Sequence, residues 1–239
     1  MLGSLAMQLG TAGQGLAIGW EVYQRTGQAL SLAWVGLIQA LPMLFLTLPA
    51  GVLADRCDRR RVISIGLVGA SVVSVGLGIA SMMEASILWL YGLLLLNSCF
   101  VRAAWPARTA ILPMLVPRDV FENAVKWRSS IGQVGGMVGP ALGGFVIAWH
   151  LPSAYFLAAV ATALFPVLLL RLDLQVQDRV QSAVRGLAGV MYELREGLVF
   201  VWRNKLLLGA ISLDMFAVLL GGAVYLLPIF ANDILKVGE

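Results

Sequence analysis

The chain has 239 residues, of which 59% are apolar and 13% charged, and its formal net charge is +4. Soluble domains carry about a quarter charged residues and slightly under half apolar ones. This composition, with a mean hydropathy of +0.86, excludes a soluble globular fold and an intrinsically disordered chain. The two cysteines are too few for a disulfide-stapled secreted fold, so a polytopic membrane protein remains.

Seven apolar runs are long enough to cross a ~30 Å hydrocarbon core as helices, which takes about 20 residues each. In chain order they are Met1–Tyr23, Leu30–Leu53, Val62–Met83, Ser86–Ala107, Ser129–Trp149, Pro152–Leu170 and Leu206–Phe230. The short segments of alternating polarity that build a membrane β-barrel are absent. The predicted fold class is therefore all-α, a polytopic bundle of membrane helices.

Lysine and arginine collect in three connections, 56–61, 102–128 and 171–205, which lie on one side of this bundle. Of the 17 basic residues, only Arg25 and Lys236 fall on the other side. Because the basic side of a membrane protein faces the cytoplasm, we expect a multi-pass protein of the cell inner membrane with a cytoplasmic N-terminus.

The long connection 171–205 carries a single apolar stripe. Its apolar residues recur at intervals of three and four, as Leu187, Met191, Leu194, Leu198 and Val201. This spacing predicts an amphipathic helix along the cytoplasmic interface. The chain is thus expected to consist of a six-helix bundle over 1–170, this connecting helix over 171–205, and the first helix of an incomplete second bundle over 206–239.

A specific motif closes the second apolar run. Asp55 stands among arginines, where it can make charge-assisted hydrogen bonds, and Gly51 four residues earlier allows close helix packing. A generic basic loop would explain the arginines but not this glycine and aspartate. The motif consists of Gly51, Asp55, Arg56, Asp58, Arg59, Arg60 and Arg61.

This motif resembles the loop between helices two and three of the major facilitator superfamily, Gly-x-x-x-Asp-Arg-x-Gly-Arg-Arg, with Asp58 in place of the second glycine. The variant is similar to the branch that contains bacterial enterobactin-type exporters. The resemblance implies that the loop is a conformational latch on the cytoplasmic side, which contacts the second half of the transporter.

A second motif lies in the fifth run. Gly135, Gly139 and Gly143 are spaced by four and form a smooth strip for close packing of another helix, while Pro140 removes a backbone hydrogen bond and bends the helix. Ordinary tight packing would explain this strip. With Gly144, the motif also resembles the Gly-Pro-x-x-Gly-Gly signature of helix five in the same family, which implies an exporter that works as an antiporter.

The resemblance extends over nearly the whole chain and implies the six-helix N-terminal half plus a seventh helix of a twelve-helix transporter. It implies proton-coupled export of a small amphipathic compound, such as a siderophore or a drug. Because seven helices are an odd number for this fold and Met1 begins within an apolar run, we expect a fragment that does not transport by itself. A half-transporter that depends on a partner remains an alternative.

Two charged residues within the runs are candidates for coupling transport to protons, and for Arg102 this role is what the family resemblance implies, because the fourth helix of the family often carries an arginine tied to coupling. Arg102 lies ~24 Å along the fourth helix, where its side chain can extend to the interface, so a structural and a coupling role stay open. Asp214 in the last run has too short a side chain for this, so it should be protonated, paired or facing water. Near the outer interface, Glu21 and Arg25 are expected to form a weak surface ion pair.

Five polar residues within the runs are candidates for lining a substrate cavity, although such residues also serve as hydrogen bonds between helices. They are Gln8, Gln14, Gln39, Asn97 and Gln133. We expect the lipid bilayer, a small-molecule substrate, protons and the missing C-terminal helices as partners, with no nucleic acid and no cofactor or metal.

Other function classes find little support in the sequence. A single histidine and no paired carboxylates within the runs give an enzyme no obvious site, and no phosphate-binding loop points to ATP. A retinal protein needs a lysine within its last helix, but Lys126, Lys205 and Lys236 lie in connections or at ends. A membrane adaptor that does not transport remains an alternative.

Overall fold

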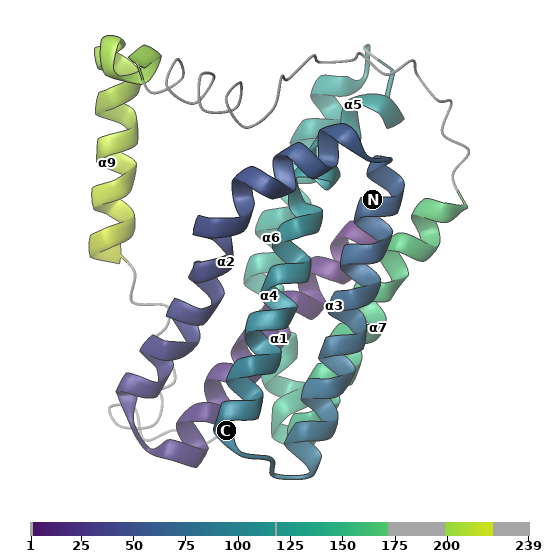
Figure 1. Cartoon of the computed structure of the whole chain (residues 1–239), viewed down its shortest axis with the longest axis vertical. Helices are drawn as coiled ribbons and strands as arrows, with labels where there is room; N and C mark the ends of the chain where they lie inside the picture. Colours follow the sequence, from purple (N-terminus) through teal and green to yellow (C-terminus); the bar gives the residue numbers. More distant parts are fainter. Residues whose placement is uncertain (1, 118, 172–198, 222–239) are drawn as a thin grey trace. The chain divides into compact units, whose positions relative to one another are not determined.

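The computed structural model describes residues 2–117, 119–171 and 199–221, and the regular secondary structure within them is helical (Figure 1). A first compact unit contains most of the helices: α1 (Leu2–Thr26), α2 (Ala29–Arg56), α3 (Arg59–Met82), α4 (Ile87–Ala110), α5 (Leu112–Leu115), α6 (Phe121–Trp149) and α7 (Leu151–Leu170). Helix α9 (Lys205–Gly221) belongs to a second unit and is described by itself.

The six helices expected for the first bundle are present, as α1 to α4, α6 and α7, and the largest difference in bounds is at the start of α6. Helix α6 begins at Phe121 rather than Ser129, and the short helix α5 precedes it. The added turns of α6 contain Glu122 and Lys126, so they are too polar to appear in an apolar run. The helix predicted over 171–205 lies mostly outside the described residues, although 199–203 are helical.

Five of the described helices are long and apolar enough to cross a membrane: α2, α3, α4, α6 and α7. Helix α1 is also 25 residues long, but its many glycines and glutamines lower its hydropathy. Helix α9 has 17 described residues, and the rest of the seventh predicted run, 222–230, lies outside the description. An all-α polytopic membrane bundle is thus confirmed.

The helix contacts in the bundle follow an internal symmetry. Helix α1 packs against α6 and α7, while α4 packs against α2 and α3, and α3 also contacts α7. If α1, α2 and α3 are exchanged with α4, α6 and α7, each of these contacts maps onto another of them or onto itself. Repeats of three helices, related by an inverted arrangement, form the halves of many secondary transporters.

Apolar side chains fill the interior and also cover much of the outside. One core cluster surrounds Ile18, Leu77 and Tyr155, and a second surrounds Ile63 and Leu67. Half of the apolar window of α3 is buried, but less than a quarter of that of α2, α4 or α6. Outward apolar surface of this extent suits a protein whose solvent is lipid.

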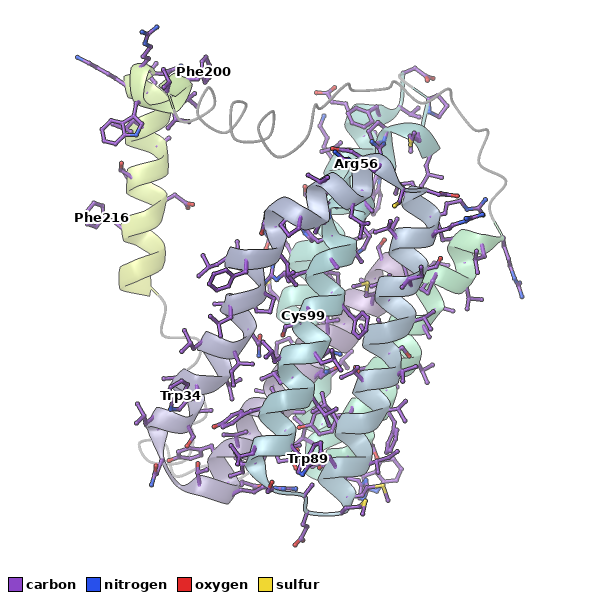
Figure 2. The ribbon with its side chains drawn as sticks, viewed as in Figure 1. Trp34, Arg56, Trp89, Cys99, Phe200 and Phe216 are labelled. Atoms are coloured by element: carbon purple, nitrogen blue, oxygen red, sulfur yellow. The ribbon has the colours of Figure 1, made fainter. Side chains whose placement is uncertain are left out.

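The two ends of the bundle differ in character. Figure 2 shows Arg56 at one end, and Trp34 and Trp89 at the opposite end. The connection from α2 to α3, the segment from α4 to α6 and the end of α7 all lie at the Arg56 end (Figure 1). We call it the arginine-rich end. Exposed tryptophans near helix ends are typical of membrane–water interfaces.

Candidate functional site

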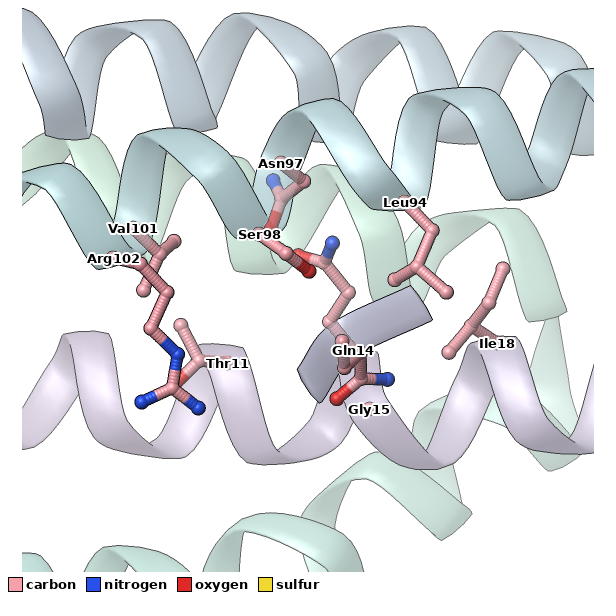
Figure 3. A pocket seen from close by; sticks show the side chains of 10 residues that line it. Thr11, Gln14, Gly15, Ile18, Leu94, Asn97, Ser98, Val101 and Arg102 are labelled. Carbon is pink, nitrogen blue, oxygen red and sulfur yellow. The ribbon is translucent and has the colours of Figure 1, made fainter. Parts of the chain in front are cut away.

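A pocket of about 130 Å³, lined by both polar and apolar side chains, lies between α1, α2 and α4. On α1 the lining residues recur at helical spacing, and so do those on α4, so each helix contributes one continuous face. The lining residues are Thr11, Gln14, Gly15, Ile18, Gln39, Leu94, Asn97, Ser98, Val101 and Arg102 (Figure 3). Drug-sized ligands occupy pockets of roughly 300–1,000 Å³, so this volume accommodates only part of such a molecule.

The pocket brings together four of the residues that the sequence singled out: Gln14, Gln39, Asn97 and Arg102. The other two glutamines do not line it. Gln8 packs against Gly135 of α6, and Gln133 lies exposed on α6.

The sequence reasoning missed Thr11 and Ser98, which also line the pocket. Their signal was present, because each lies three or four residues from a polar residue of the same helix face.

A hydrogen-bond network at the side of the pocket connects α1, α3 and α4. Asn97 Nδ2 donates to the Ala70 carbonyl (2.9 Å) and to Ser74 Oγ (3.0 Å). Ser74 Oγ in turn donates to Gln14 Oε1 (2.9 Å). Both Gln14 and Ser74 are buried, so the network satisfies polar groups that lipid and apolar side chains would leave without partners.

Arg102 is the one charged residue among those that line the pocket. Figure 3 shows its side chain extending from α4 toward α1, beside Thr11. Other arginines of the bundle have partners: Arg108 lies over the ring of Phe165, 5.0 Å from its centroid, and Arg25 pairs with a carboxylate.

The start of α3 is held to the ends of two other helices. Arg59 Nη1 donates to the Ala110 carbonyl at the end of α4 (3.1 Å). Arg60 Nη2 donates to the Leu169 and Leu170 carbonyls at the end of α7 (2.8 and 3.0 Å). Carbonyls in the last turn of a helix have no partner within the helix and carry partial negative charge, so arginines suit them.

The two aspartates near the junction of α2 and α3, Asp55 and Asp58, have separate roles. Asp58 precedes α3, and its side chain accepts a hydrogen bond from the Arg60 backbone N–H (2.9 Å), which caps the helix. A glycine at this position could not provide that bond. Asp55 Oδ1 lies 3.6 Å from Arg59 Nη2, and the Asp55 side chain is 55% exposed.

Three further residues of the 51–61 motif, Gly51 and Arg56 in α2 and Arg61 in α3, are not packed closely against another described helix. Arg56 and Arg61 are exposed. A Cβ added at Gly51 would meet nothing within 4 Å, so no described helix packs closely there.

The glycines of α6 lie against α1. A Cβ added at Gly139 would be 2.6 Å from Ala12 Cβ, and one at Gly143 would be 2.7 Å from Gly13 Cα. Pro140 lies inside α6, which continues through it to Trp149. In contrast, Gly144 faces open space within the described structure. The strip therefore packs two helices of the same bundle together.

The expectation of a weak surface pair between Glu21 and Arg25 is wrong. Glu21 is 2% exposed; its Oε1 lies 2.5 Å from Arg25 Nη2, and its Oε2 accepts from the Tyr155 hydroxyl of α7 (2.5 Å). Arg25 also donates to the Ser81 carbonyl in the last turn of α3 and to the Ala85 carbonyl in the turn that follows. This cluster connects three helices, and the sequence spacing could not reveal its third member on α7.

Asp214 lies on α9 and is exposed there. The described residues of α9 do not test a coupling role for Asp214, which stays a prediction. Within the described residues, no group of three or more His, Cys, Asp and Glu side chains could hold a metal ion.

The sequence profile described as "Major Facilitator Superfamily" matches residues 1–238. The chain belongs to this family. Its members and the relatives below are membrane transporters, so transport, rather than catalysis, is the activity to which the family membership points. No solved structure matches the chain at a significant level.

Several curated proteins are similar to this chain. An uncharacterized MFS-type transporter, YfiS, of Bacillus subtilis is 31% identical over 78% of the chain and 44% of its own length. Macrolide efflux protein A of Streptococcus pyogenes is 27% identical over 88% and 50%. The multidrug efflux pump Tap of Mycobacterium tuberculosis is 31% identical over 95% and 57%. The chain thus spans about half the length of these relatives.

Proposed function

We propose that the chain forms part of a secondary active transporter that exports a small amphipathic compound in exchange for protons. The observation that carries this proposal is the pocket containing Arg102 within an apolar bundle of this family. In such transporters the substrate binds between two halves that rock against each other. The names of the macrolide and multidrug efflux relatives support export.

The segment 51–61 would act as the latch between the two halves, on the cytoplasmic side of the inner membrane. Its anchoring through Arg59 and Arg60 at the start of α3 supports this role, because a connection held at one end keeps a defined position. Asp55 and Arg56 remain accessible to a second half. In this proposal the arginine-rich end and the N-terminus face the cytoplasm.

Proton coupling would involve Asp214, a carboxylate within a predicted membrane span. Helix α6 would provide the antiporter signature through Gly135, Gly139, Pro140, Gly143 and Gly144. Arg102 is the alternative coupling residue, because it is the charged side chain of the pocket.

The exported compound would be a drug or a siderophore. The names of the efflux relatives favour a drug-like molecule, while the loop sequence that ends in Arg59, Arg60 and Arg61 is the basis for the enterobactin-exporter comparison. Both are amphipathic molecules larger than the pocket of one half, so further helices would complete the binding site.

The test is an accumulation assay in bacteria that lack their major efflux pumps. The cells express the complete reading frame that contains this chain, and they are exposed to cationic, neutral and anionic amphipathic dyes. We expect at least one dye to accumulate severalfold less than in cells with an empty vector, and a protonophore to abolish the difference. Equal accumulation of every dye, with the protein present in the membrane, would contradict the proposal.

A further inference from the structure

The pocket between α1, α2 and α4 has an unusual charge balance. Its lining contains the guanidinium of Arg102 and no carboxylate. Within the described residues, no hydrogen bond or ion pair of this guanidinium is found, whereas Arg25, Arg59 and Arg60 at the two ends all have partners. A charged group within a membrane bundle is stable only with a counter-charge or water.

The hydrogen bonds beside the pocket determine which polar groups remain available. The Ala70 carbonyl can only accept a hydrogen bond, so the side-chain atom of Asn97 that faces it must be the amide nitrogen and not the oxygen. Ser74 Oγ accepts from that same nitrogen, and its own hydrogen goes to the carbonyl oxygen of Gln14. The amide nitrogen of Gln14 is therefore left to donate to a molecule in the pocket.

The one charge of the lining sits on a donor, because the acceptors there, such as Asn97 Oδ1 and Gln39 Oε1, are neutral. Arg102 offers several N–H groups, and Gln14 adds its amide nitrogen. The hydroxyl of Thr11 already donates to the Met7 carbonyl (2.8 Å). A group rich in acceptors and carrying negative charge fits this set, and arginine binds carboxylates and other oxyanions through paired hydrogen bonds.

The size and the apolar lining of the pocket determine what the rest of the bound molecule must be like. A pocket of about 130 Å³ holds a headgroup and not a whole drug-sized molecule. Ile18, Leu94 and Val101 line the same pocket, so an apolar part must lie directly next to the charged group. This combination describes an amphipathic organic anion.

We propose that Arg102 binds the anionic group of the exported compound, so that the transporter selects amphipathic organic anions over amphipathic cations of the same core. This inference rests on the proposed export function and names its substrate class. Gln14 would donate a second hydrogen bond to the same group, and Gln39 of α2 would lie at the edge of the headgroup site.

The test measures energised dye uptake into inside-out membrane vesicles that contain the complete reading frame. The probes are fluorescein, an anionic xanthene dye, and rhodamine 123, a cationic dye with a related core. For each dye, the uptake rate of vesicles without the protein is subtracted from that of wild-type vesicles. We expect the remaining rate to be at least about tenfold higher for fluorescein than for rhodamine 123. Arg102→Gln should lose most of this uptake, and Arg102→Lys should keep part of it. Arg171→Gln, which removes an exposed arginine at the end of α7, is the control and should transport normally.

A second variant keeps the proposal testable if Arg102→Gln is not inserted in the membrane. Gln39→Glu adds a carboxylate to the same pocket and should shift the preference from fluorescein toward rhodamine 123. Faster uptake of the cationic dye by the wild type, or unchanged fluorescein uptake in Arg102→Gln, would overturn this inference and leave export standing. No energised uptake of either dye, together with no efflux in cells, would overturn both proposals.

Discussion

Replacement of Gly143 by alanine tests the contact between α1 and α6 at the point where the added Cβ would meet backbone. The added Cβ would lie 2.7 Å from Gly13 Cα, which is backbone and cannot rotate away. Carbon atoms in contact are separated by about 3.5–4.0 Å, so the two helices would have to move apart by roughly 1 Å. Overpacking of this kind costs about 1–3 kcal/mol.

The matched control is Gly144→Ala, one residue further along the same helix, where the added Cβ would meet nothing within 4 Å. Both substitutions gain up to about 1 kcal/mol of helix propensity. The difference between them therefore isolates the contact with Gly13. For a chain of this size, about 1 kcal/mol corresponds to roughly 2–4 °C in melting temperature.

The assay is thermal unfolding of the purified protein in detergent, followed by tryptophan fluorescence. We expect Gly143→Ala to unfold roughly 2–12 °C below Gly144→Ala, and Gly144→Ala to unfold at or above the temperature of the wild type. Melting temperatures that agree within about 1 °C for the two variants would refute the close packing of α1 on α6.

Three further substitutions test other parts of the account. Asp55→Asn should abolish transport, measured by dye uptake, and leave dye binding to the purified protein close to normal. The control Glu122→Gln should transport normally. Normal uptake by Asp55→Asn would contradict the latch role. Glu21→Gln removes the carboxylate that pairs with Arg25 and should lower the free energy of unfolding by about 3–5 kcal/mol. The exposed control Glu84→Gln should change it little. Similar losses of stability in the two variants would show that the cluster is not stabilising. Asp214→Asn should make uptake insensitive to the proton gradient, and full gradient-driven uptake in this variant would limit Asp214 to a structural role.

The approximate bounds of the membrane helices could be predicted from the sequence, because in lipid the backbone N–H and C=O groups can form hydrogen bonds only with each other. A run such as Pro152–Leu170 therefore corresponds closely to α7. The early start of α6 at Phe121 was not predictable from apolar runs. Its first turns carry charged residues, and they lie at the arginine-rich end, where water and headgroups replace lipid.

Side-chain partners on other helices were harder to predict. Gln8 and Gln14 both lie in α1, but six residues on a helix turn the side chain by about 120°. Gln14 consequently faces the pocket, while Gln8 faces α6. Glu21 shows the same limit, because its spacing from Arg25 indicates a helical pair but contains no information on Tyr155, which comes from α7.

Export in exchange for protons can be measured as substrate-dependent proton movement in reconstituted vesicles. The complete reading frame that contains this chain is purified and placed in liposomes that hold a pH-sensitive dye. When an exported dye is added on one side, we expect proton movement in the opposite direction, with none in empty liposomes or in the Asp55→Asn variant. Substrate movement across these membranes without any accompanying proton flux would contradict this expectation.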